Sequence, residues 1–166
     1  MLKLKDAYIN NSIFFDVLFA GIIVGVNFIP GLFTFHINDK KDNIDILSDI
    51  ISASISLAGF ILAALTIIVS MRSNIGNKPE NQVRSPMELF FSDANYSKVL
   101  SAFQIAIVEL TSIFILSYVI WISVANVDNE LLFSILLALF FMIGSCVIRT
   151  LSILFMIINI DRPNLS

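Results

Sequence analysis

Residues 47–71 read LSDIISASISLAGFILAALTIIVSM, and this apolar stretch decides the fold. A helix needs about 20 mostly apolar residues to cross the hydrocarbon core of a bilayer. Inside lipid every backbone N–H and C=O group must be hydrogen-bonded within the protein, so a single run of this length forms a helix. The stretch therefore predicts a membrane-spanning helix.

Three further apolar runs have the same character and cover residues 12–35, 98–125 and 131–160. Of the 166 residues, 57% are hydrophobic and 14% are charged, whereas a typical soluble domain has about 45–50% and about 25%. A transmembrane β-barrel would instead show short segments of alternating hydrophobicity. We therefore expect an all-α membrane protein, in which residues 1–166 form one four-transmembrane-helix bundle.

The distribution of positive charge predicts the orientation of these helices. With four spans, both termini lie on the same side of the membrane. Because Lys and Arg are retained in the cytoplasm, we expect a multi-pass protein of the bacterial inner membrane, with both termini and a loop at residues 72–97 inside and residues 35–46 and 125–130 outside. Outside the spans or at their edges, only Lys40 and Lys41 lie on the outer side, against seven on the inner side: Lys3, Lys5, Arg72, Lys78, Arg84, Lys98 and Arg162.

Small and hydroxyl residues recur along the second predicted span. Each follows the previous one by three or four positions, so all lie on one face of a helix. Such a face lets two helix backbones approach closely, which is its commonest use. On several copies around an axis it would also line a narrow, water-filled pore. Both interpretations are open for these residues, which are Ser48, Ser52, Ser56, Gly59, Ala63, Thr66 and Ser70.

Two ionisable residues lie deep inside the predicted spans, where a charge is costly and needs a reason. Glu109 lies 20 residues before Asn129, and Arg149 lies 20 residues after it. In an antiparallel hairpin with its turn near Asn129, equal offsets mean equal depth, so we predict an intramembrane ion pair between Glu109 and Arg149. Either the pair is structural and holds the hairpin or neighbouring subunits together, or one member faces a water path.

Asp16 is a third acidic residue within a predicted span. It lies about one turn into the first span from the cytoplasmic side, and Arg72 lies at the cytoplasmic end of the second. Their similar depth makes a pair between them one interpretation. The alternatives are that Asp16 reaches the lipid headgroups or interacts with Lys98.

The sequence lacks the patterns of a catalytic or metal site. His36, the only histidine, lies near Asp39, Asp42 and Asp45, but one histidine with dispersed acids does not have the ligand spacing of a zinc site. There is no nucleophile with a matching base and no glycine-rich phosphate loop. The net charge of -3 gives no case for nucleic-acid binding. We expect no enzyme, no cofactor and no metal.

Three classes of membrane protein remain. The first is a homo-oligomeric ion channel or membrane-permeabilising effector, because four short helices do not easily enclose an aqueous path without further copies. The second is a small proton- or cation-coupled transporter that uses Glu109, although the chain shows no inverted repeat. The third is an accessory or immunity-type membrane subunit that only packs against another protein.

The segment Ser56-Leu57-Ala58-Gly59-Phe60-Ile61-Leu62-Ala63-Ala64-Leu65-Thr66-Ile67 resembles the second span of small bacterial four-helix membrane proteins encoded beside anti-phage genes. The plan of four spans with both termini inside and a basic cytoplasmic loop is also similar. The named family that it resembles is the membrane effector of the Hailong defence system and, more loosely, the four-span effectors of cyclic-oligonucleotide defence systems.

This resemblance implies a homo-oligomeric ion channel, with a tetramer expected. It also implies gating by a nucleotide or oligonucleotide from a partner nucleotidyltransferase, and depolarisation of the membrane during infection. Such a signal is anionic and needs cations on the cytoplasmic side. The positive-inside rule alone also accounts for the candidates, which are Arg72, Lys78, Arg84 and Lys98.

Overall fold

The computed structural model of the chain describes residues 12–27, 39–76 and 95–160, and all of these except Asp39, Val127 and Asp128 are helical. The order along the chain is α2 (Ser12–Asn27), α3 (Lys40–Gly76), α5 (Asn95–Ser123), the short 3-10 helix η1 (Val124–Asn126) and α6 (Asn129–Ile160). The all-α class predicted from the sequence is confirmed.

Three of these helices are long and apolar enough to cross a membrane, and they cover Lys40–Ser73, Tyr96–Asn126 and Asn129–Ile157. They correspond to the second, third and fourth predicted spans. The remaining long helix, α2, corresponds to the first predicted span; it is apolar but shorter, with 16 residues. The predicted continuation of the first span to residue 35 lies outside the described residues.

The start of α3 differs from the sequence prediction. Residues 40–46 were expected in an outer loop, but they are helical and lengthen the second predicted span at its N-terminal end. Asp39 explains this start, because its carboxylate accepts a hydrogen bond of 2.9 Å from the backbone N–H of Lys41. This is the N-cap interaction that satisfies an unpaired donor of the first turn. Asp42 adds a negative charge in that turn, which the helix dipole favours.

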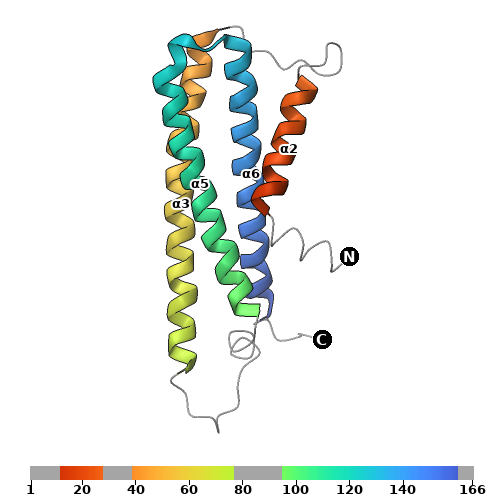
Figure 1. The fold of residues 1–166 in the computed structure, drawn as a ribbon. Helices are drawn as coiled ribbons and strands as arrows, with labels where there is room; N and C mark the ends of the chain where they lie inside the picture. The colour runs from red at the N-terminus through yellow and green to blue at the C-terminus, as the bar shows by residue number, and fades with distance from the viewer. Residues whose placement is uncertain (1–11, 28–38, 77–94, 161–166) are drawn as a thin grey trace.

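Figure 1 shows α3, α5 and α6 side by side, with α2 lying against α6. Neighbours along the chain run in opposite directions, so α2 and α5 point one way and α3 and α6 the other. The core lies among the three long helices. Its most deeply buried large side chains are Leu47 from α3, Phe103 and Leu110 from α5, and Leu132 from α6, each at most 1% exposed.

Polar contacts connect the N-terminal end of α3 to the start of α6 and the turn before it. The Asn43 side-chain amide donates a hydrogen bond of 2.7 Å to Oδ1 of Asn129. The Lys40 ammonium donates one of 2.8 Å to the backbone carbonyl of Val127. These contacts join segments more than 80 residues apart in the sequence, so they fix the register of α3 against the turn between α5 and α6.

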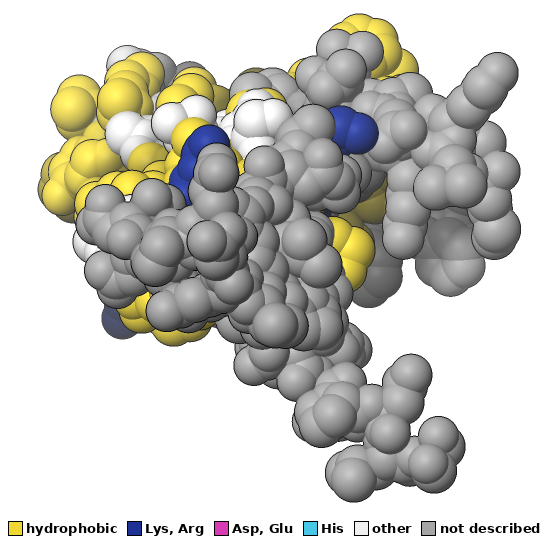
Figure 2. Space-filling model, turned by 90° about the horizontal axis from the view of Figure 1, so that it is seen from below, with side chains coloured by type: hydrophobic (Ala, Val, Ile, Leu, Met, Phe, Trp, Pro, Cys, Tyr) yellow, Lys and Arg dark blue, Asp and Glu magenta, His cyan; other side chains and the backbone are white. Residues whose placement is uncertain are grey.

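The two ends of the bundle differ in charge. Figure 2 looks at the end where α3 stops and α5 begins, and it shows basic side chains but no acidic one among the described residues on that surface. The exposed acidic residues in the described part gather at the opposite end, just before α3, in its first turns and around the turn before α6; they are Asp39, Asp42, Asp45, Asp49, Asp128 and Glu130.

Candidate functional site: a buried charge cluster and an exposed helix face

One arginine joins two carboxylates inside the bundle. The structure brings Arg149 of α6 and Glu109 of α5 together, with 2.5 Å between Nη2 and Oε2. The other terminal nitrogen of Arg149, Nη1, lies 2.5 Å from Oδ2 of Asp16 on α2. We call Asp16, Glu109 and Arg149 the charge cluster. It connects three helices at one depth.

The interpretation that pairs Asp16 with Arg72 is wrong, and the structure pairs Asp16 with Arg149 instead. Asp16 lies against α6, where its second oxygen, Oδ1, accepts a hydrogen bond from the Ser145 hydroxyl. The side chain is buried, so it does not reach the headgroups. Arg72 is exposed, and its guanidinium lies 4.1 Å above the ring of Tyr96 in a cation–π contact. The depth of Asp16 within its predicted span did not reveal that α2 packs on α6 rather than on α3.

The cluster is shielded from its surroundings. The side chains of Asp16, Glu109 and Arg149 are 3%, 1% and 4% exposed. Within the described part of the chain, Oε1 of Glu109 and Nε of Arg149 have no hydrogen-bond partner. A buried charged or polar atom without a hydrogen-bond partner costs free energy. The cluster therefore combines two ion pairs with two buried atoms that lack a partner.

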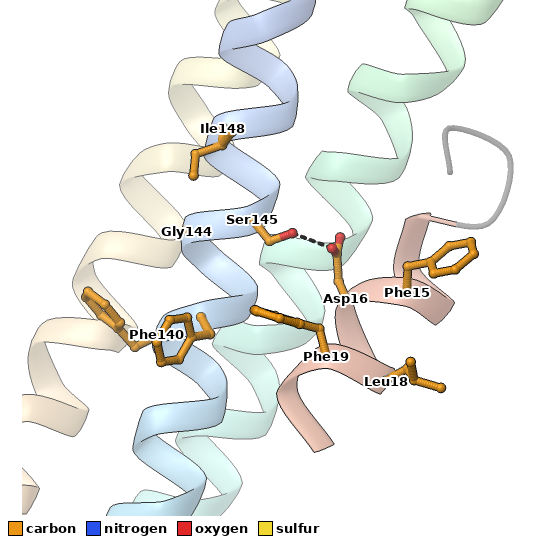
Figure 3. Close-up of a pocket in the computed structure, with 9 residues that line it drawn as sticks. Phe15, Asp16, Leu18, Phe19, Phe140, Gly144, Ser145 and Ile148 are labelled. Carbon is orange, nitrogen blue, oxygen red and sulfur yellow. Dashed lines mark hydrogen bonds between the residues drawn. The ribbon is translucent and has the colours of Figure 1, made fainter. Parts of the chain in front are cut away.

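A hollow of about 690 Å³ lies beside the cluster, between α2 and α6. Figure 3 shows Asp16 reaching from α2 to Ser145 of α6 at this hollow. Aromatic rings wall it, and Phe19 meets Phe141 edge-to-face with 6.2 Å between ring centroids. The hydrogen bond between Asp16 and Ser145 therefore lies among apolar side chains, where water competes weakly for it.

The small and hydroxyl residues that recur along the second predicted span lie on the side of α3 that faces away from the core. All seven residues, which we call the small-residue face, are exposed: Ser48, Ser52, Ser56, Gly59, Ala63, Thr66 and Ser70. The buried side chains of α3 lie on the opposite side of the helix, and they include Leu47, Ile50, Ser54, Ala58, Ile61 and Ile68. Within one chain, this face contributes nothing to the core.

Open space surrounds the middle of this face. A Cβ atom added at Gly59 would meet nothing within 4 Å. The hydroxyl groups of Ser52, Ser56 and Thr66 donate to backbone carbonyls four residues earlier in their own helix, at 2.7–3.0 Å. Since the hydrogens are used within the helix, the oxygen lone pairs remain to accept hydrogen bonds or to bind a cation.

The candidate contacts for an anionic ligand are only partly described. Arg72 and Lys98 are exposed at the end of the bundle where α3 stops and α5 begins. Lys78 and Arg84 lie outside the described residues. The structure thus shows two of the four cations on the same end of the molecule.

The chain was compared with models of protein families, with curated proteins and with solved structures, and none of them matches it. What the molecule offers for function is the charge cluster and the small-residue face. The same three-helix core positions both of them.

Proposed function

We propose that this chain is a subunit of a homo-oligomeric cation channel, in which the small-residue face of α3 lines the conduction path. The observation that carries the proposal is that the whole face is exposed opposite the buried side of α3. A continuous small face has no packing advantage against lipid, but it lets helices of several copies approach one another and enclose a narrow path.

The character of the face favours cations. Its oxygen lone pairs are available because three of its hydroxyl hydrogens are bonded within the helix. Toward the outer end, exposed Asp45 continues the same line one turn before Ser48, and exposed Asp49 lies beside it. In a symmetric assembly these carboxylates form rings at the outer mouth, and acidic rings select cations.

The other exposed surface suits a lipid contact. Large apolar side chains point outward from α5 and α6, including Ile122 at 75%, Ile148 at 68% and Phe140 at 64% exposed. We place these helices on the lipid side of each subunit, with α3 toward the axis. The charge cluster then braces α2, α5 and α6 behind the lining helix.

We further propose that the channel belongs to the bacterial inner membrane with its basic end in the cytoplasm, and that an anionic nucleotide acts on it there. Exposed Arg72 and Lys98 support this placement. Recording ion flux while ATP or a cyclic dinucleotide is added to the reconstituted protein tests it. A response that disappears in the Arg72→Gln, Lys98→Gln double variant supports the proposal, and an unchanged response in that variant contradicts it.

The channel itself is tested with two matched variants of α3. Ala63→Leu places a bulky side chain in the small-residue face, and Ala53→Leu places the same side chain at an exposed position about 80° from Ala63 around the helix. Because both positions are exposed, neither change disturbs the core of one subunit. We expect reconstituted Ala63→Leu to lose ion flux and Ala53→Leu to retain it.

The mass of each purified protein in detergent completes this experiment. The proposal predicts a discrete oligomer for the wild-type chain and for Ala53→Leu. Equal flux from the two variants would contradict the pore-lining role of α3. A stable oligomer that conducts no ions with or without nucleotide would favour an accessory membrane subunit instead.

A further inference from the structure

Among the described residues, the charge cluster has two acids and one base. Asp16 and Glu109 are both buried against a single guanidinium, that of Arg149. No other Asp, Glu, Lys or Arg occurs in α2, in residues 99–126, in residues 131–160 or in the stretch of α3 from residue 50 to 71. Cys146 is a further titratable group beside the cluster; its thiol is buried and donates to the carbonyl of Ala106.

An uncompensated charge at this position is unfavourable for two reasons. The groups are removed from water, and the surroundings within the spans are apolar. A buried acid that lacks a counter-ion takes up a proton rather than remain charged. Glu109 is in this position, because it shares Arg149 with Asp16 and one of its oxygens is buried without a hydrogen-bond partner.

The hydrogen bonds distinguish the two acids. Both oxygens of Asp16 accept, one from Ser145 and one from Arg149, as a carboxylate does. Glu109 accepts from Arg149 through Oε2 only, and its Oε1 is buried without a partner in the described part of the chain. Oε1 is thus the one carboxyl oxygen of the cluster on which a proton displaces no existing hydrogen bond.

We propose that the charge cluster is a proton-binding site, with the proton on Oε1 of Glu109 and with its occupancy controlling how firmly α2 is held. With the proton bound, Arg149 forms an ion pair with Asp16 and donates a hydrogen bond to Oε2 of the neutral Glu109 side chain. When the proton leaves, Glu109 competes with Asp16 for the same guanidinium. Since α2 packs chiefly on α6, this competition weakens its attachment. The inference does not depend on the pore.

Infrared spectroscopy of the whole chain in lipid nanodiscs at neutral pH tests the site, because a protonated carboxyl group has a C=O stretching band that a carboxylate lacks. We expect this band in the wild type and its loss in Glu109→Gln. We also expect its loss in Asp16→Asn, since one remaining acid then balances Arg149. Asp49→Asn, an exposed acid at the outer end, is the control that retains the band.

The second readout uses the wild type alone and needs no variant to fold. Raising the pH should remove the band and, in parallel, increase the hydrogen exchange of the α2 amides relative to those of α5. Absence of the band at neutral pH, or its persistence in Glu109→Gln, would overturn the proposal. Persistence in Asp16→Asn would overturn the charge-balance reason for the proton, and loss of the band without faster exchange in α2 would overturn the link to α2.

Discussion

At the scale of single residues, Arg149 connects three helices through its side chain. Its two terminal nitrogens bond carboxylates from two different helices, and the side chain is 4% exposed. A buried ion pair adds little net stability compared with an apolar pair, but removal of one partner leaves the other charge without compensation. The arginine is therefore far more costly to remove than its net contribution to stability suggests.

We predict that Arg149→Met strongly destabilises the fold. The change leaves Asp16 and Glu109 buried together, and breaking a buried pair in this way costs about 3–5 kcal/mol. Thermal unfolding in detergent, followed by circular dichroism, measures the effect.

Arg72→Met is the matched control for this prediction. Arg72 is exposed, and its cation–π contact with Tyr96 is worth only about 0.5–1 kcal/mol. If the two variants unfolded at the same temperature, the stabilising role of the charge cluster would be refuted.

The pairing in this cluster was predictable only in part. The partners Glu109 and Arg149 lie on consecutive helices joined by a short turn, so their depth follows from counting residues on either side of Asn129. The contact of Asp16 with Arg149 joins residues 133 positions apart. It depends on which long helix α2 packs against, and no hydrophobic pattern of α2 specifies that choice, because α2 is apolar almost all round.

At the scale of the helices, length and type followed directly from the apolar runs, whereas the ends depended on local chemistry. The charged residues Lys40, Lys41 and Asp42 indicated a loop, yet they form the first turn of α3. Asp39 was the signal for this start, because an Asp before a helical run is an N-cap residue. The turns of α3 that precede the apolar stretch also bring Asn43 opposite Asn129.

Asn43→Ala tests whether that contact stabilises the end of the bundle at which α3 begins. The side chain is 0% exposed, and its amide bonds Asn129 at 2.7 Å. We predict a loss of about 1 kcal/mol, the usual net value of one hydrogen bond, and faster hydrogen exchange at the first turns of α6. Lys41→Ala, a change in an exposed neighbour, serves as the control. Unchanged exchange in Asn43→Ala would show that apolar packing alone fixes this end.

At the scale of the whole molecule, the asymmetry of charge between the two ends has a consequence for topology. Positive residues favour the cytoplasmic side, and exposed Arg72 and Lys98 lie at the end opposite the acidic turns. We predict that green fluorescent protein fused to the C-terminus is fluorescent in bacteria and that alkaline phosphatase fused there is inactive. The opposite pair of results would invert the topology and move the acidic end inside.

The function that we propose for the whole molecule depends on a surface that the described helices of one chain do not pack against. The sequence predicted the small-residue face but left two uses open, because spacing shows which residues share a face and not what that face contacts. The structure narrows this choice: the face is exposed, so it is not used for packing between helices of the same chain. Contact with further copies, around a water-filled path, is the use that we propose.

The most direct test of this account is cysteine accessibility along α3. In a Cys146→Ser background, single cysteines replace Ser52, Ser56, Ala63 or, as the control, exposed Ala53, and a charged, water-soluble thiol reagent is added to the reconstituted protein while ion flux is recorded. We predict that the reagent blocks flux through the three variants of the small-residue face and leaves the Ala53→Cys protein unaffected. Flux that persists in all four variants, with the three cysteines unmodified, would show that α3 does not line a pore.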